Sequence, residues 1–299
     1  MGCTTSVPDE SAWLAQFIPP PGSDSPAGAA RVSEELVDFA GLVSDASTIH
    51  SPSRRNVVSW LPPSAAAATP LAGIVVLLHG LHEHCFRHHE LASLLATSGN
   101  MCVYGVDHFG HGRSEGLRGM IYDWNKTIAE VVAFVEHVRA KHPDTSVPLF
   151  IFAHSCGALF TTLTIPRLSA AATPRAVVLS ATALIAGPDS GSPFGFKCLF
   201  PLTELKSFES LVGLLAAVAP TGDGAPIIRE GLMHDEAERA LHKADPRIYP
   251  GCIRTKTAYE LVKMQNQVGR PSVRPSWCAL LWSSSDSPPP PPHTHTHRS

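Results

Sequence analysis

Short apolar runs recur along the middle of the chain, and most are separated by segments long enough to form a helix. Continuous runs of this kind are typical of strands buried on both faces of a parallel sheet. The predicted strands are 56–61, 74–78, 102–107, 149–152, 176–179 and 278–281. The pattern therefore predicts an α/β fold with a doubly wound, mostly parallel sheet.

One of the intervening segments has a clear helical period. In residues 127–141 apolar side chains such as Ile128, Val131 and Val135 recur every three or four positions, which places them on one side of a helix. Pro143 ends the pattern, because proline cannot continue a helix. We expect this helix to cover one face of the sheet.

The alternation of strands and helices stops in residues 188–250. This segment begins at a Gly-Pro pair and holds two apolar patches, 194–202 and 211–218. Periodicity allows two interpretations of these patches, helices of an inserted cap or two ordinary core helices. Their position after the fifth predicted strand favours a helical cap at 188–250.

The two ends of the chain differ in composition from its middle. Residues 1–50 are rich in Pro, Ala, Ser and Gly and predict a flexible arm. Residues 287–299 form a low-complexity tail, in which five prolines precede alternating His and Thr. The catalytic-size domain is therefore predicted at 55–286, and 299 residues with 44% hydrophobic content can bury one large core.

Charge and cysteine content exclude several classes of protein. A formal charge of −3 and the lack of a basic stripe argue against nucleic acid as a partner. The seven scattered cysteines show no paired spacing, which favours free thiols in a reducing, cytoplasmic compartment. The sequence contains neither a signal peptide nor an apolar run of about 18 residues, the length of a membrane span. The oligomeric state stays open.

The first residues nevertheless point to a membrane. Gly2 and Ser6 fit the N-myristoylation pattern, and Cys3 is placed to accept palmitate. Two acyl chains anchor a protein stably, whereas a single myristoyl chain binds a bilayer only marginally. The expectation is a protein tethered to the cytoplasmic face of a membrane through Gly2 and Cys3. The alternative is a chance match in a short motif, which would leave the protein cytoplasmic.

A candidate nucleophile, Ser155, lies in the sequence Ala-His-Ser-Cys-Gly at 153–157, directly after the predicted strand 149–152. A serine between a strand and a helix occupies a tight, strained turn with small residues two positions away on either side. The backbone N–H of Cys156, at the start of that helix, is then placed to stabilise an oxyanion.

A second oxyanion donor is predicted in the turn after the strand 74–78. There His79 and Gly80 precede Leu81, whose N–H would lie beside Ser155 at the carboxyl edge of a parallel sheet. Each motif is weak alone, and together they indicate a serine hydrolase. Such an enzyme also needs a general base to activate the serine and an acid to orient that base.

Three segments give the chain its resemblance to a known family: 79–84 (His-Gly-Leu-His-Glu-His), 104–116 and 152–157. Over about residues 55–265 the chain resembles the α/β-hydrolase superfamily, and more narrowly the monoacylglycerol lipase and lysophospholipase group, also described as serine aminopeptidase-like. Ala153 stands where that family usually has glycine. The resemblance implies structural roles for Asp107 and His111.

The same resemblance implies a function. It is the cleavage of carboxylic esters of single-chain lipids, monoacylglycerol or lysophospholipid, through an acyl-enzyme at Ser155. The cap would line an acyl-chain tunnel, and no cofactor or metal is expected.

The remaining catalytic residues are harder to place. The family's pattern Leu-x-His-Gly-x-x-Asp aligns with 280–286 and makes Asp286 the candidate acid, although Trp and Ser replace His and Gly. Asp286 is equally well explained as an exposed residue of a serine-rich tail. The histidines that follow it are His293, His295 and His297, and the extended polyproline rod before them would direct them into water.

The tail suggests why the base is hard to find. Alternating His-Thr is what a CA-dinucleotide repeat encodes, and a proline run is what a C-rich tract encodes. We expect that a frameshift, a truncation or an incorrect gene model has replaced the last strand and helix of an intact hydrolase. The alternative function is therefore a catalytically impaired or inactive hydrolase that binds acyl lipids.

A histidine-rich segment resembles a metal cluster without matching one. Its members are His82, Glu83, His84, Cys85, His88 and His89. Neither an HExxH pattern nor paired cysteines occur, so the sequence predicts no metal site. His154 is expected to point away from Ser155 and to serve in packing.

Overall fold

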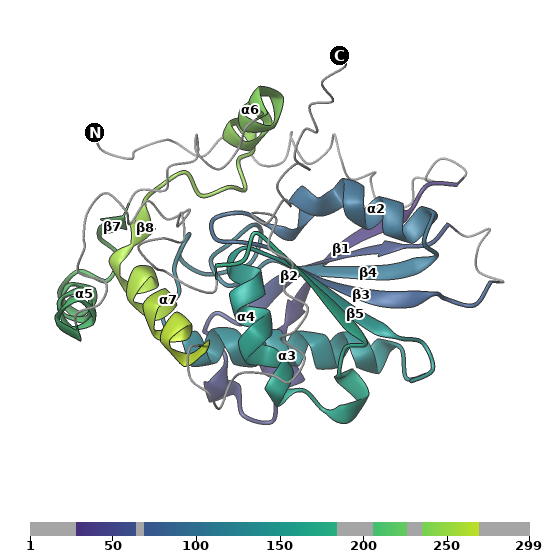
Figure 1. Ribbon diagram of the computed structural model, residues 1–299, viewed down its shortest axis with the longest axis horizontal. Coiled ribbons are helices and arrows are strands. Elements are labelled where there is room, and N and C mark those ends of the chain that lie inside the picture. The colour runs from purple at the N-terminus through teal and green to yellow at the C-terminus, as the bar shows by residue number, and fades with distance from the viewer. Residues whose placement is uncertain (1–27, 64–68, 184–205, 226–234, 269–299) are drawn as a thin grey trace, which may run out of the picture.

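The computed structural model describes residues 28–63, 69–183, 206–225 and 235–268, and its centre is a six-stranded sheet (Figure 1). The strands are β1 (Arg31–Asp38), β2 (Arg54–Leu61), β3 (Gly73–Leu78), β4 (Met101–Val106), β5 (Leu149–His154) and β6 (Ala176–Ser180). They lie in the order β1-β2-β4-β3-β5-β6, with β2 antiparallel to both of its neighbours and the other pairs parallel. The expected mostly parallel sheet is confirmed, and the predicted strand 278–281 lies outside the described residues.

The sheet carries helices on both faces because its central strands are apolar on both. Every residue of β3 is buried. Ile74, Val76 and Leu78 pack in one core with helices α3 (Trp124–Lys141) and α4 (Cys156–Thr164). Val75 and Leu77 pack in a second core with α2 (His89–Thr97) on the opposite face. The helix predicted at 127–141 is confirmed as α3.

A buried ion-pair network joins strand β2 to helix α3. Glu130 of α3 accepts hydrogen bonds from Arg55 of β2 at 2.7 and 3.1 Å. Its carboxylate also accepts the backbone N–H of His50 at 2.8 Å and contacts the ring of that histidine at 2.9 Å. Arg55 and Glu130 are both buried, so each charge depends on the other for compensation.

The ordered part of the chain begins earlier than the sequence indicated. A flexible arm was expected over residues 1–50, but β1 pairs with β2 along its whole length, from Arg31 opposite Leu61 to Asp38 opposite Arg54. This part of the prediction is wrong because β1 is an edge strand with a polar, mostly exposed sequence and lacks the apolar run of a central strand. Residues 1–27, which include Gly2 and Cys3, lie outside the described residues.

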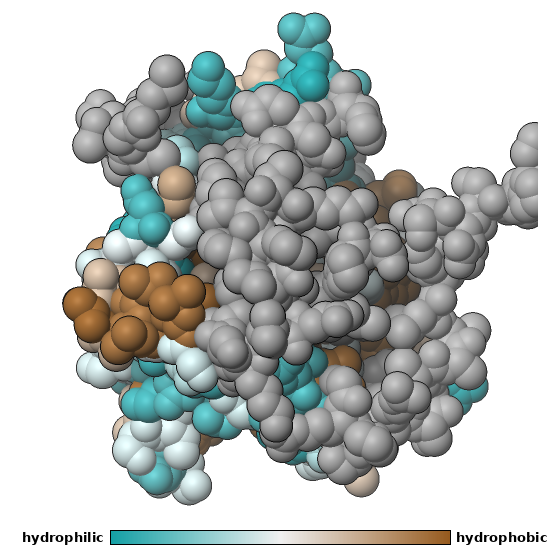
Figure 2. Space-filling model, turned by 60° about the vertical axis from the view of Figure 1, so that its left-hand side comes forward, coloured by the Kyte–Doolittle hydropathy of each residue, from teal (hydrophilic) through white to brown (hydrophobic). Residues whose placement is uncertain are grey.

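Beyond the sheet, the chain forms α5 (Lys206–Val218), β7 (Asp223–Ala225), α6 (Glu236–Ala244), β8 (Ile253–Arg254) and α7 (Thr255–Val268). Helix α7 packs against α4 and also against α5, whose outer face is apolar and exposed. The exposed side chains of α5 are Leu211, Leu214, Leu215 and Val218, with 47, 61, 48 and 77% of their surface accessible. Figure 2 turns this side of the molecule toward the viewer and shows an apolar patch there.

Among the described residues nothing covers this face of α5, and both interpretations that periodicity left open, a cap helix and a core helix, stay predictions. The other apolar patch, 194–202, lies outside the described residues, so the cap at 188–250 stays a prediction. Among the described helices, none has the length and apolar character that crossing a membrane requires.

Strand β6 is the edge of the sheet on the side of β5 within the described residues. Its Val178 is 58% exposed, whereas strands inside a parallel sheet are usually covered on both faces. The described residues therefore leave one face of this parallel edge strand open.

Candidate active site

Ser155 occupies the sharp turn between β5 and α4, where the sequence placed the nucleophile. Its backbone has φ 52° and ψ −114°, a conformation that costs energy for any residue other than glycine. The turn is fixed by the Ser155 N–H, which donates to the carbonyl of Ser180 on β6 at 2.9 Å. The side chain stays partly accessible, so the turn presents the hydroxyl at the carboxyl edge of the sheet.

Two glycines allow the backbones around Ser155 to approach closely. A Cβ atom on Gly157 would lie 2.5 Å from the carbonyl oxygen of Leu78, so helix α4 and strand β3 leave no room for a side chain there. A Cβ atom on Gly80 would lie 2.9 Å from the Cβ of Ser155. The structure thus brings the turn after β3 against the nucleophile, as the two sequence motifs predicted.

The two predicted oxyanion donors lie at this junction. Cys156 begins α4, and the first N–H groups of a helix have no acceptor within the helix. The Leu81 backbone and the Ser155 side chain both act on the pKa of the Cys156 thiol, so the three residues lie together. Burial raises the pKa of that thiol to about 12, so Cys156 stays protonated and does not compete with Ser155 as a nucleophile.

Behind the turn lies a small cavity. Its lining residues are Gly80, Leu81, His108, Phe109, His111, Met120, Ile121, Thr127 and Phe160. Its volume of about 10 Å³ is roughly the space of one water molecule. A space of this size does not hold an acyl chain.

Buried imidazoles brace the turn that carries Leu81. The Nε2 atom of His79 accepts the backbone N–H of His108 at 3.0 Å, and its Nδ1 atom contacts the carbonyl of Gly80 at 2.7 Å. Burial, reinforced by His111, holds the pKa of His79 well below its usual value. Because both of its ring nitrogens are engaged by backbone groups, His79 is a structural residue rather than a catalytic base.

The Asp107–Gly116 segment has the supporting role that the family resemblance implied. The buried carboxylate of Asp107 accepts the backbone N–H groups of Cys85 at 2.8 Å and Arg113 at 2.9 Å, and the Asn56 amide at 2.9 Å. Burial opposes the charge, but His84 and these donors outweigh it and lower the pKa of Asp107. The charged carboxylate of Asp107 holds the loop in place through these hydrogen bonds and has a structural role, not one in proton transfer.

A pair that sequence reasoning missed lies beside the nucleophile. Glu83 accepts the N–H of Gly80 at 2.6 Å and contacts Nδ1 of His154 at 2.7 Å with the same oxygen. Burial opposes the Glu83 charge, but His154 and His88 outweigh it and hold the Glu83 pKa well below its usual value. Burial likewise opposes a charge on His154, yet Glu83 raises its pKa.

His154 was expected to serve in packing, and it is instead one half of this ion pair. Both residues belong to motifs that the sequence singled out, 79–84 and 153–157. The direction of their side chains, however, depends on how the two turns meet.

The acid and the base of a serine hydrolase are not brought together with Ser155 by the described residues. The candidates Asp286, His293, His295 and His297 all lie outside them. Within the described part of the chain, no histidine is hydrogen-bonded to the hydroxyl of Ser155. The nucleophile and the oxyanion donors are thus the portion of the site that the structure describes.

Comparison with known proteins agrees with this geometry. Residues 69–288 match the family "Serine aminopeptidase, S33", a hydrolase family. The chain belongs to this family. It is 35% identical to the mouse monoglyceride lipase over 229 residues, which are 76% of this chain and 67% of the mouse protein. It is also 28% identical to the human monoglyceride lipase over 71% of this chain and 62% of the human one.

Solved structures support the fold. A monoacylglycerol lipase of Paleococcus ferrophilus matches with a TM-score of 0.52 at 22% identity, covering 71% of this chain and 70% of that one. A soluble variant of the Saccharomyces cerevisiae monoglyceride lipase matches with a TM-score of 0.55 at 18% identity, covering 81% and 71%. The chain thus has the α/β-hydrolase fold, and its hydrolase family together with its monoglyceride lipase relatives supports a lipase-like carboxylic ester hydrolase.

Proposed function

We propose that this hydrolase cleaves the ester bond of single-chain lipids, monoacylglycerol or lysophospholipid, through an acyl-enzyme at Ser155. The observation that carries the proposal is the strained turn of Ser155, which lies between the start of helix α4 at Cys156 and the turn after β3 that holds Leu81. The names of the mouse and human relatives favour monoacylglycerol. The exposed apolar face of α5 fits a substrate presented at a lipid surface.

In this mechanism the Ser155 oxygen attacks the ester carbonyl carbon, and a histidine base takes its proton. The negative charge that develops on the carbonyl oxygen is stabilised by the N–H groups of Leu81 and Cys156. The alcohol then leaves with a proton from the base, and water hydrolyses the acyl-enzyme by the same route. We propose Asp286 as the acid and one of His293, His295 and His297 as the base.

A fluorophosphonate probe tests the proposal, because it labels an activated serine whatever the substrate. The full chain and its Ser155→Ala variant are incubated with the probe, and hydrolysis of 2-oleoylglycerol is measured in parallel. We expect labelling and glycerol ester cleavage that both depend on Ser155. Labelling without cleavage of monoacylglycerol or lysophosphatidylcholine would contradict the substrate class but not the nucleophile.

One observation favours a second function. The histidines that follow Asp286 in the sequence stand behind a polyproline run that would direct them into water, and a serine without its base loses roughly a million-fold in kcat. A folded chain that fails to react with the probe would be a binding protein for acyl lipids. Retention of a radiolabelled monoacylglycerol without its cleavage would identify that function.

We further propose that acylation of Gly2 and Cys3 tethers the protein to the cytoplasmic face of a membrane. The support is the sequence motif alone. Membrane fractionation of cells expressing the protein, its Gly2→Ala variant and its Cys3→Ser variant tests it. Both variants should move to the soluble fraction, because a single acyl chain binds a bilayer only marginally. Equal membrane fractions for all three proteins would refute the tether.

A further inference from the structure

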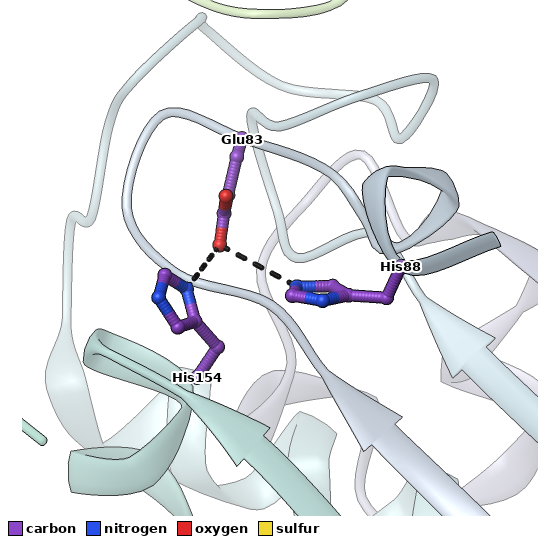
Figure 3. Close-up of side chains that lie close together, drawn as sticks. All are labelled: Glu83, His88 and His154. Carbon is purple, nitrogen blue, oxygen red and sulfur yellow. Dashed lines mark hydrogen bonds and ion pairs between the residues drawn. The ribbon is translucent and has the colours of Figure 1, made fainter. Parts of the chain in front are cut away.

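Three potential metal ligands converge beside the nucleophile turn, from segments far apart in the sequence (Figure 3). Glu83 comes from the turn after β3, His88 ends the 3₁₀ helix Cys85–His88, and His154 is the last residue of β5. One oxygen of Glu83 lies 2.7 Å from Nδ1 of His154 and 3.8 Å from Nε2 of His88. One ligand atom from each residue lies within 4.8 Å of the other two.

These distances are close to those of a transition-metal site. A tetrahedral Zn²⁺ ion holds nitrogen and oxygen ligands at about 2.0–2.2 Å, which puts any two ligands about 3.3–3.5 Å apart. An ion that entered here would separate Glu83 from His154 by roughly 0.7 Å and bring His88 roughly 0.4 Å closer to Glu83. Side-chain rotations alone can supply shifts of this size.

His88 gives independent support, because its ring nitrogen has no hydrogen-bond partner. Its Nε2 atom is buried, and the 3.8 Å that separates it from Glu83 exceeds hydrogen-bonding range. Buried polar atoms almost always have a hydrogen-bond partner, and this long ion-pair contact leaves room for an ion between the nitrogen and the carboxylate. His88 and His154 are 17% and 31% exposed, which leaves the cluster open to an entering ion.

The other polar groups around Glu83 are compatible with a cation. The Gly80 N–H donates to the oxygen that faces the histidines. Arg87 lies 3.4 Å from the other oxygen, and its positive charge weakens cation binding without occupying the space between the rings. The neighbouring histidines of the sequence cluster have other partners: His84 bonds Asp245 at 2.7 Å, and His89 accepts the Trp60 indole N–H at 2.9 Å.

We propose that Glu83, His88 and His154 form a binding site for a divalent transition-metal ion such as Zn²⁺, with water as the fourth ligand. Two imidazole nitrogens with one carboxylate favour Zn²⁺ over Mg²⁺ or Ca²⁺, which prefer oxygen ligands. The sequence predicted no metal, because the three residues do not form a local motif. The fold assembles them.

The position of the site suggests a regulatory effect. Glu83 holds the N–H of Gly80, the residue before the oxyanion donor Leu81, and His154 directly precedes Ser155. A metal ion that binds the Glu83 oxygen would therefore disturb both the turn that holds Gly80 and Leu81 and the residue that precedes Ser155. This effect on catalysis rests on the proposed function, whereas metal binding itself does not.

Calorimetric titration of the full chain with Zn²⁺ tests the site without relying on activity. The three tail histidines would bind metal on their own, so the parent protein is the full-length variant His293→Ala/His295→Ala/His297→Ala. The titration is run at pH 8, because Glu83 raises the pKa of His154 and the metal must displace its proton. Co²⁺ in place of Zn²⁺ gives a visible spectrum that reports tetrahedral coordination.

We expect one Zn²⁺ per parent chain, and His88→Phe in this background should weaken binding at least tenfold, the least that losing a direct ligand should cost. Phenylalanine preserves the packing of the His88 ring against Phe152. The matched control His137→Phe removes a half-buried imidazole from α3 and should bind as the parent does. Glu83→Gln provides a second ligand variant should His88→Phe fail to fold. Failure of the parent to bind Zn²⁺, or equal affinity in the parent and a folded ligand variant, would overturn the proposal.

Discussion

The Glu83–His154 pair makes a prediction about stability that can be worked out from its contacts. In Glu83→Gln the amide oxygen can still accept the Gly80 N–H, but the charge that strengthens this bond and the His154 contact is lost. A hydrogen bond to a charged group contributes about 1.5–3 kcal/mol, against about 0.5–1.5 kcal/mol for a neutral one. Two weakened bonds should therefore lower the free energy of unfolding by about 2–3 kcal/mol.

The loss should depend on pH in a defined direction. The pKa of Glu83 is lowered in the folded protein, so its contribution is present above the ordinary value of 4.5 and lost as pH falls through the folded pKa. The pKa of His154 is raised, so its contribution is present below 6.5 and lost as pH rises through the folded pKa. The difference between wild type and Glu83→Gln should be greatest between pH 4.5 and 6.5.

Urea denaturation of both proteins at pH 6 and pH 9 measures this difference. Thermal unfolding at pH 6 should show a Tm lower by roughly 4–12 °C, at about 2–4 °C per kcal/mol for a domain of this size. The control is Glu90→Gln, which removes an exposed carboxylate three residues beyond Arg87 and should change stability by less than about 0.5 kcal/mol. A stability difference for Glu83→Gln that is absent at pH 6, or larger at pH 9 than at pH 6, would refute the ion-pair reasoning.

Three further predictions follow from packing and exposure. Gly157→Ala should abolish fluorophosphonate labelling and lower the free energy of unfolding by about 1–3 kcal/mol, because the added methyl lies 2.5 Å from the Leu78 carbonyl oxygen. Full labelling of this variant would show that the backbone can move enough to accept the methyl group. Glu130→Ala should cost about 3–5 kcal/mol in urea denaturation by leaving Arg55 buried and unpaired, and a loss below 1 kcal/mol would show that water compensates the charge. Leu214→Asp should lower hydrolysis of vesicle-bound monoacylglycerol severalfold while sparing a soluble short-chain ester, because Leu214 is 61% exposed on the apolar face of α5; equal loss on both substrates would point to misfolding instead.

The sequence predicted the central strands well because burial on both faces leaves a strong signal. Each strand from β2 to β6 coincides with one of the expected apolar runs to within a residue or two, and α3 contains the helix that the period of Ile128 and Val131 indicated. Strand β1 escaped prediction for the opposite reason. Its polar sequence satisfies an edge position, and only the pairing with β2 makes it a strand.

The residues of the site likewise divide into those that the sequence could place and those that it could not. Ser155, Cys156 and Leu81 could be placed because the backbone turns that present them need small residues at fixed spacing. The contact between Glu83 and His154 could not, because it depends on how two loops 71 residues apart direct their side chains. Local sequence determines a turn, whereas a side-chain cluster between turns depends on the whole sheet.

That dependence connects the nucleophile to the metal site proposed beside it. Ser155 and His154 are consecutive residues at the end of β5, and the turn beyond β3 supplies both Leu81 and Glu83. Ser155 and Leu81 lie on one side of this junction, and Glu83 contacts His154 on the other. A metal ion at the proposed site would compete with that contact, and the same Glu83 oxygen accepts the N–H of Gly80, the neighbour of Leu81. The metal site that we propose would therefore act on the nucleophile turn through the bond between Glu83 and Gly80.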